Sequence, residues 1–157
     1  MQELPLKIKT KKIEADKANP PIGVGLMAWS FDSKLLATRD DNIPHCLWIW
    51  DMSSLELSNL LIHSNPIKSV AWSPKSGHLA FCTGTAQIFL WSREGASVCT
   101  IPIEAKGFSI QRVQWNPNGK SLLVVDKLRL TVACPQPEFF AQNDTYTYDE
   151  DPNSPQE

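Results

Sequence analysis

The chain has 157 residues, about one ordinary domain, and its 42% hydrophobic and 20% charged residues are typical of a globular protein. The formal net charge of −2 excludes a global field that would favour nucleic acid or anionic lipid. The N-terminal residues lack the apolar core of a secretory signal, and no apolar run is long enough to span a bilayer. The four cysteines are 36, 17 and 35 residues apart, which predicts free thiols in a reducing compartment. We therefore expect a cytoplasmic protein without nucleic-acid or membrane partners.

The first twenty residues differ in character from the rest of the chain. Residues 4–8 alternate apolar and polar side chains, and five lysines occur by Lys17. This pattern predicts a solvated basic linker, or an edge strand guarded by lysines, over residues 1–20. The sequence Asn19-Pro20-Pro21 stops regular structure before the next segment.

One pattern then occurs three times, with its tryptophans Trp29, Trp72 and Trp115 spaced 43 residues apart. In each copy a short strand ends at the tryptophan and a polar turn leads into a second strand. The turns of the second and third copies contain proline and glycine, which favour a tight hairpin. A fixed period of this length indicates a repeat architecture.

Further strands complete each copy. Second strands are predicted at 35–38, 78–83 and 121–125, third strands at 46–51, 87–92 and 128–133, and fourth strands at 57–62 and 97–101. Four short strands in roughly 43 residues are typical of a β-propeller blade. The predicted fold is therefore all-β, a partial propeller of about three four-stranded blades within 21–138, with blades at about 21–63, 64–106 and 107–138. The tryptophans that keep the period are expected between blades.

The blades resemble those of the WD-repeat family, which close on a Trp-Asp pair. Trp50-Asp51 matches that pair, while Trp91-Ser92 keeps only its tryptophan. The resemblance implies a hydrogen-bonded brace of a histidine, a strand hydroxyl, a turn aspartate and the tryptophan. The residues carried over as its structural members are His63, Thr83, Trp91, Trp50 and Asp51. Because Gly84-Thr85 replaces the turn aspartate in the second blade, we expect an incomplete brace and a greater dependence on apolar packing.

A closer resemblance covers roughly residues 4–135. The segments 16–26, 36–44, 47–51, 79–84 and 89–92 are similar to the late blades of the WRAP-type WD-repeat proteins of centrosomes and spindle poles. This resemblance implies a non-enzymatic protein–protein interaction scaffold in centrosome or spindle-pole assembly and microtubule anchoring. It implies a location at the centrosome, spindle pole or centriolar satellites, and a coiled-coil centrosomal protein as partner.

Three blades would form an open arc with two unprotected edges, whereas closed propellers have four to eight blades. We therefore expect the missing blades of a longer chain as further partners, and a fragment rather than a self-sufficient domain. Alternative interpretations are a WD-repeat substrate receptor or RNA-process scaffold, and a non-functional truncated fragment.

Motifs for catalysis, cofactors or metals are not found. The glycines form no phosphate-binding loop, and no nucleophile elbow or zinc-binding HExxH occurs. His45 and Cys46 are neighbours on a strand and point to opposite faces, so they do not converge on one ion. His78 follows a turn glycine and is expected to be exposed. We predict neither enzymatic activity nor a cofactor or metal.

The remaining polar positions near the strand starts and loops are candidates for partner contacts, because loops carry binding while the scaffold holds them. These candidates are Lys68, Ser69, Gln111, Arg112 and Arg39. Residues 139–157 contain five acidic residues, no basic ones and two prolines. That composition predicts a disordered acidic tail.

Overall fold

The computed structural model describes residues 22–102 and 107–135, together with residues 8, 10–12, 16, 18 and 20. The acidic tail predicted at 139–157 lies outside the described residues, as does most of the basic segment predicted at 1–20. Within the described part, the regular structure consists of eleven β-strands. None of the described residues forms a helix that could cross a membrane.

The strands form three antiparallel sheets, each built from consecutive strands. The first contains β1 (Val24–Trp29), β2 (Leu35–Asp40), β3 (Cys46–Asp51) and β4 (Glu56–Ile62). The second contains β5 (Ser69–Trp72), β6 (Leu79–Cys82), β7 (Gln87–Ser92) and β8 (Gly95–Thr100). The third comprises, within the described residues, β9 (Arg112–Trp115), β10 (Leu122–Val125) and β11 (Leu130–Ala133).

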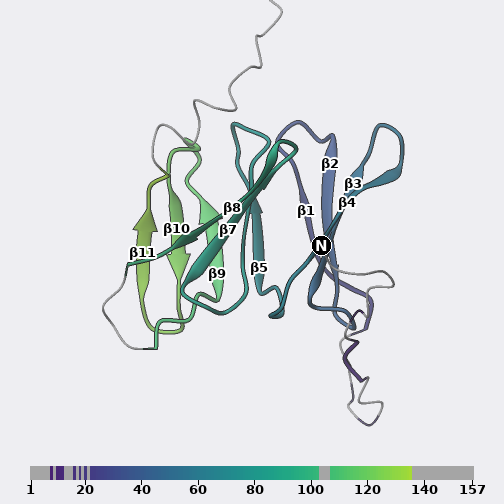
Figure 1. Ribbon diagram of the computed structural model, residues 1–157, viewed down its shortest axis with the longest axis horizontal. Helices are drawn as coiled ribbons and strands as arrows, with labels where there is room; N and C mark the ends of the chain where they lie inside the picture. Colours follow the sequence, from purple (N-terminus) through teal and green to yellow (C-terminus); the bar gives the residue numbers. More distant parts are fainter. Residues whose placement is uncertain are drawn as a thin grey trace, which may run out of the picture.

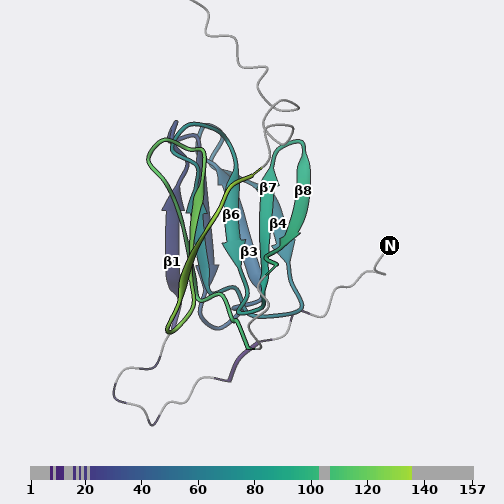
Figure 2. The ribbon, with the colours of Figure 1, turned by 90° about the vertical axis from the view of Figure 1, so that its left-hand side faces the viewer.

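The three sheets lie side by side in chain order, as blades do in a propeller (Figure 1). Seen from the side, β1 lies at one edge of the molecule, with β4 and β8 towards the opposite edge (Figure 2). The first strands of successive sheets contact each other, β1 with β5 and β5 with β9. The predicted all-β propeller architecture is confirmed, and we refer to the sheets as blades 1, 2 and 3.

The core lies between blades because successive strand residues point to opposite faces. In β6, Leu79 and Phe81 contact the apolar cluster shared with blade 1, whereas Ala80 and Cys82 contact the cluster shared with blade 3. All four are buried. Strand β6 is therefore covered on both faces, and burial raises the pKa of the Cys82 thiol to about 11.

A tryptophan hydrogen bond repeats between neighbouring blades. The Trp72 indole donates to the Ala28 carbonyl at 2.9 Å, and the Trp115 indole donates to the Ala71 carbonyl at 3.0 Å. Both rings are buried. Trp72 and Trp115, 43 residues apart, thus make the same contact, and each joins its blade to the backbone of the blade before it.

Trp29 occupies the same repeat position but differs from the expected inter-blade tryptophans, since 53% of its surface is exposed. Met27 and Val24 on the same strand are also exposed. The cause is that no described blade covers this face of blade 1.

The expectation that His78 is exposed is wrong. His78 is buried, and its Nδ1 lies 2.8 Å from the Ser76 hydroxyl. The Ser73 amide donates to the His78 carbonyl at 2.8 Å, which closes the turn between β5 and β6. A turn glycine indicates backbone conformation and says little about the burial of the next side chain.

Candidate partner-binding surface

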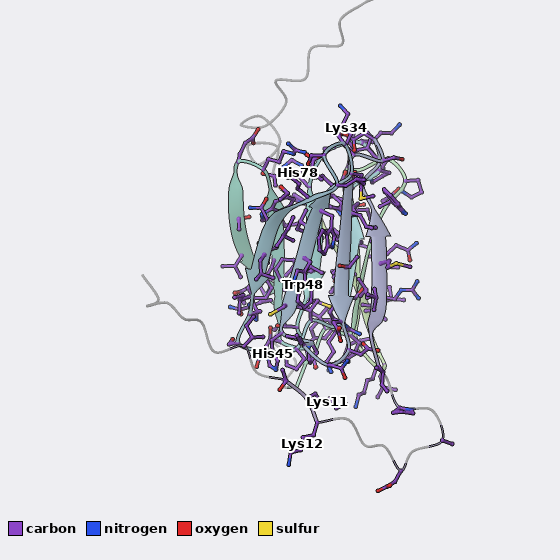
Figure 3. The ribbon with its side chains drawn as sticks, turned by 90° about the vertical axis from the view of Figure 1, so that its right-hand side faces the viewer. Lys11, Lys12, Lys34, His45, Trp48 and His78 are labelled. Atoms are coloured by element: carbon purple, nitrogen blue, oxygen red, sulfur yellow. The ribbon has the colours of Figure 1, made fainter. Side chains whose placement is uncertain are left out.

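The loops that carry most of the candidate residues gather at one end of the blades. These are the β2–β3, β4–β5, β6–β7, β8–β9 and β10–β11 connections, which antiparallel order places at a common end. In Figure 3, His45, Lys11 and Lys12 mark this end, and Lys34 and His78 mark the opposite end. The Lys11 amide donates to the Asn42 carbonyl at 2.7 Å, so this part of the N-terminal segment lies against the β2–β3 turn.

Two adjoining hollows open at this end between blades 2 and 3. The larger, about 520 Å³, is lined by Lys68, Thr83, Gly84, Gly107, Ser109, Gln111, Asp126, Lys127, Leu128 and Arg129. The smaller, about 410 Å³, extends along the first strands of the blades and is lined by Leu26, Lys68, Ser69, Val70, Ala71, Gln111, Arg112, Val113 and Gln114. Lys68 and Gln111 line both hollows, which together we call the basic cleft.

Four of the five candidate residues therefore come together at the basic cleft. Lys68 is exposed, and its backbone is held by a 2.8 Å hydrogen bond from its amide to the Cys82 carbonyl. Ser69 joins two blades, because its hydroxyl accepts a 3.3 Å hydrogen bond from the Val113 amide. The Gln111 side-chain amide donates to the Ser109 carbonyl and hydroxyl at 3.0 and 2.8 Å. Arg112 lies exposed at the start of β9.

Arg39, the fifth candidate, has a different environment. Its guanidinium is half-buried, donates to the Ile67 carbonyl and forms an ion pair with Asp41. The Asp41 carboxylate lies directly over Gly25, where a Cβ atom would overlap it. Arg39 therefore holds the backbone beside Lys68 and links blade 1 to blade 2, instead of presenting a free charge.

The cleft also contains side chains that the sequence analysis missed. The β10–β11 turn contributes Asp126, Lys127 and Arg129. The Asp126 carboxylate accepts a 2.6 Å hydrogen bond from the Lys127 amide and lies 3.3 Å from the Arg129 guanidinium. The Lys127 bond first, and Arg129 in addition, hold the pKa of the Asp126 carboxylate below its ordinary value. The Arg129 guanidinium lies over the Phe108 ring, 5.4 Å from its centroid. The sequence signal for this site was the charged turn between the second and third strands of blade 3.

The brace residues are arranged differently in the two blades. In blade 1, the Trp50 indole donates to the Thr38 hydroxyl at 2.9 Å. Asp51 accepts a 2.9 Å hydrogen bond from the Ser53 amide and pairs with Arg93 of blade 2 at 2.8 Å. Thr38 was not among the predicted brace residues.

In blade 2, Phe81 occupies the repeat position that Thr38 has in blade 1. Phe81 pairs with Phe89 on the neighbouring strand, as Thr38 pairs with a residue of β3. His63 contacts the Phe89 ring edge-on at 4.3 Å between centroids, and Phe89 stacks on Phe81 at 5.1 Å. The Thr83 hydroxyl is buried without a hydrogen-bond partner among the described residues. Trp91 packs edge-on against Trp72. Aromatic packing therefore occupies this part of blade 2, for which we expected an incomplete brace.

The aromatic stack makes stability depend on pH. Burial lowers the pKa of the His63 imidazole below its ordinary 6.5, so the folded state favours the neutral ring. Its stabilising contribution is complete above pH 6.5 and is lost as the pH falls through the lowered pKa. We expect the urea midpoint to fall on acidification from about pH 7.5 to about 5.5.

The matched control is His63→Phe, which keeps an aromatic ring against Phe89 and cannot titrate. This variant should lose less stability over the same pH range. An equal loss in both chains would assign the effect to other groups.

None of the described residues forms a group of three or more histidine, cysteine or carboxylate side chains arranged to hold a metal ion. The cleft instead offers lysine and arginine cations together with amide and hydroxyl donors. Such groups bind anionic and hydrogen-bond-accepting partners.

Comparison with known proteins gives consistent results. Residues 70–129 match the family model described as the anaphase-promoting complex subunit 4 WD40 domain. A WD repeat-containing protein of Mus musculus, WRAP73, is 41% identical over 123 residues, covering 78% of this chain and 26% of the relative. An uncharacterized WD repeat-containing protein of Schizosaccharomyces pombe is 23% identical over 119 residues, covering 68% of this chain and 25% of the relative.

Among solved structures, a chain in a crystal structure of the mitotic checkpoint complex superposes with a TM-score of 0.56 at 20% identity. The match covers 78% of this chain and 38% of that one, and it supports the fold alone. This chain spans about a quarter of the length of the two curated relatives above.

The propeller blades, their periodic tryptophans and these matches define the class of the protein: the chain belongs to the WD-repeat family. Within that family it resembles the WRAP type, with 41% identity to WRAP73 over 78% of this chain.

Proposed function

We propose that this chain is part of a non-enzymatic scaffold that acts in centrosome or spindle-pole assembly and in microtubule anchoring. The observation that carries the proposal is its 41% identity to the WD repeat-containing protein WRAP73 over 78% of the chain. The position of Lys68, Ser69, Gln111 and Arg112 around one cleft supports a partner-binding role for that end of the blades.

The partner is proposed to be a coiled-coil centrosomal protein. Coiled coils carry charged side chains at the flanks of their apolar seam. Acidic residues at such positions would be attracted to Lys68 and Arg112, whereas Arg39 would act by fixing the backbone beside them. The chain is accordingly proposed to work in the cytoplasm, at the centrosome, spindle pole or centriolar satellites.

Further blades of a longer chain are proposed as intramolecular partners. On blade 1 the exposed face includes Trp29, Met27 and Val24, and on blade 3 the strand β11 exposes Leu130 and Val132. Exposed apolar side chains at both ends of a stack of blades are the surfaces that neighbouring blades would cover. The proposed division of the chain remains three blades at about 21–63, 64–106 and 107–138.

The proposal is tested by expressing the tagged full chain in dividing cells. We expect fluorescence at spindle poles in mitosis, and recovery of a coiled-coil centrosomal protein by affinity purification from mitotic extract. Recovery of ubiquitin-ligase subunits without any centrosomal protein would contradict the proposal and favour a substrate receptor.

A further inference from the structure

We propose that the basic cleft between blades 2 and 3 is a docking site for an acidic peptide segment that carries an aliphatic residue, supplied by a protein partner. The inference deepens the proposed function and rests on it, because it specifies the chemistry that the partner surface recognises. It depends on side chains from three connections that are far apart in sequence.

The first argument is charge. Lys68 comes from the β4–β5 connection, while Lys127 and Arg129 come from the β10–β11 turn. Lys68 and Lys127 are exposed, and no carboxylate of the described residues lies within ion-pair distance of either one. Asp126 is the one acidic residue in the described lining of the larger hollow, and it is already bound by the Lys127 amide and by Arg129. The described lining of the cleft therefore retains a positive surplus, which attracts carboxylates.

The second argument is that the floor of the cleft is already ordered. The Ser109 hydroxyl donates to the Gly84 carbonyl at 2.7 Å, and Gln111 donates to Ser109 in turn. These bonds hold Ser109 and Gln111 against the β6–β7 turn. A peptide that binds here does not need to order the site first, which reduces the entropic cost of binding.

The third argument is the shape and polarity of the rim. Leu128 is 94% exposed and lies between Lys127 and Arg129 in the same turn. An exposed leucine flanked by cations suits a segment that places an aliphatic side chain between acidic ones. The larger hollow, about 520 Å³, falls in the size range of ligand pockets, and the smaller one continues it towards Arg112.

Nucleic acid fits the cleft less well than a peptide. Single-stranded nucleic acids bind where aromatic side chains offer stacking surfaces along a basic groove. The described residues that line the two hollows include no aromatic side chain, and Phe108 is buried beneath Arg129. An acidic peptide is therefore the occupant that we propose.

The test is binding of the full chain to a short fluorescent peptide of aspartate and glutamate residues interrupted by two leucines, followed by fluorescence anisotropy. We expect Lys68→Glu and Lys127→Glu each to weaken binding by about tenfold or more. Lys120→Glu is the matched control, because Lys120 is exposed in the β9–β10 turn at the opposite end of the same blade. It should leave the affinity unchanged.

Leu128→Ser tests the aliphatic contact at a position where the side chain is almost fully exposed, so that loss of folding does not complicate the result. It should also weaken binding. Equal affinity for the same peptide with every carboxylate replaced by an amide would overturn the proposal, as would unchanged affinity in both charge reversals. Displacement of the peptide by an RNA oligonucleotide at lower concentration would overturn it in favour of nucleic acid. If the peptide fails to bind while the chain still accumulates at spindle poles, the docking chemistry is wrong and the proposed function stands.

Discussion

Replacing Trp115 with alanine is expected to lower the free energy of unfolding by about 3–5 kcal/mol. The ring is 5% exposed and belongs to the apolar cluster between blades 2 and 3. Its indole also donates the 3.0 Å hydrogen bond to the Ala71 carbonyl of blade 2. The substitution therefore opens a cavity between two blades and removes a bond that joins them. Urea denaturation followed by circular dichroism measures the loss.

Trp29→Ala is the matched control, because Trp29 has the same position in its repeat and 53% of its surface is exposed. Its replacement should cost less than half as much. Trp115→Phe should fall between the two, since it keeps most of the buried ring and loses the hydrogen bond, worth about 0.5–1.5 kcal/mol. Equal losses for Trp29→Ala and Trp115→Ala would contradict the inter-blade role of the buried tryptophans.

Phe81→Ala is expected to cost a similar amount, about 3–5 kcal/mol. Phe81 is 6% exposed, lies in the cluster between blades 1 and 2, and stacks on Phe89. Its ring also approaches His63 edge-on, 6.3 Å between centroids. Because burial is the main cause of the lowered His63 pKa, opening this site should also raise that pKa towards its ordinary value.

Phe81→Leu is the control, since a leucine retains much of the buried volume and should cost about 1.5 kcal/mol or less. Urea denaturation gives the stability of both variants, and an NMR titration of the imidazole gives the His63 pKa. A His63 pKa that stays lowered in Phe81→Ala would show that Phe81 does not shield the imidazole.

The repeat pattern was sufficient to predict the blades. The third strands at 46–51 and 87–92 have the bounds that the sequence analysis predicted, because their apolar runs end at a tryptophan followed by a polar residue. Local signals determine these features, so one sequence was enough.

Burial and side-chain pairing were harder to predict, because they depend on neighbouring blades. Trp29 keeps the repeat position of Trp72, yet it is exposed because no described blade covers it. The hydroxyl that accepts the hydrogen bond from the Trp50 indole belongs to Thr38. The register between β2 and β3 brings these two residues together, and that register is a property of the folded sheet. Lys127 and Arg129 lie near Lys68 only because two blades pack together, so the charged β10–β11 turn alone does not reveal the basic cleft.

The most direct measurement of whether partners bind at the cleft end of the blades is affinity capture from mitotic extract with charge reversals at either end. The double variant Lys68→Glu/Arg112→Glu alters the cleft end, and Lys34→Glu/Lys120→Glu alters the opposite end. We predict that the first loses the coiled-coil centrosomal partner and the second retains it. Retention by the first variant together with loss by the second would place partner binding at the other end of the blades and contradict the proposed surface.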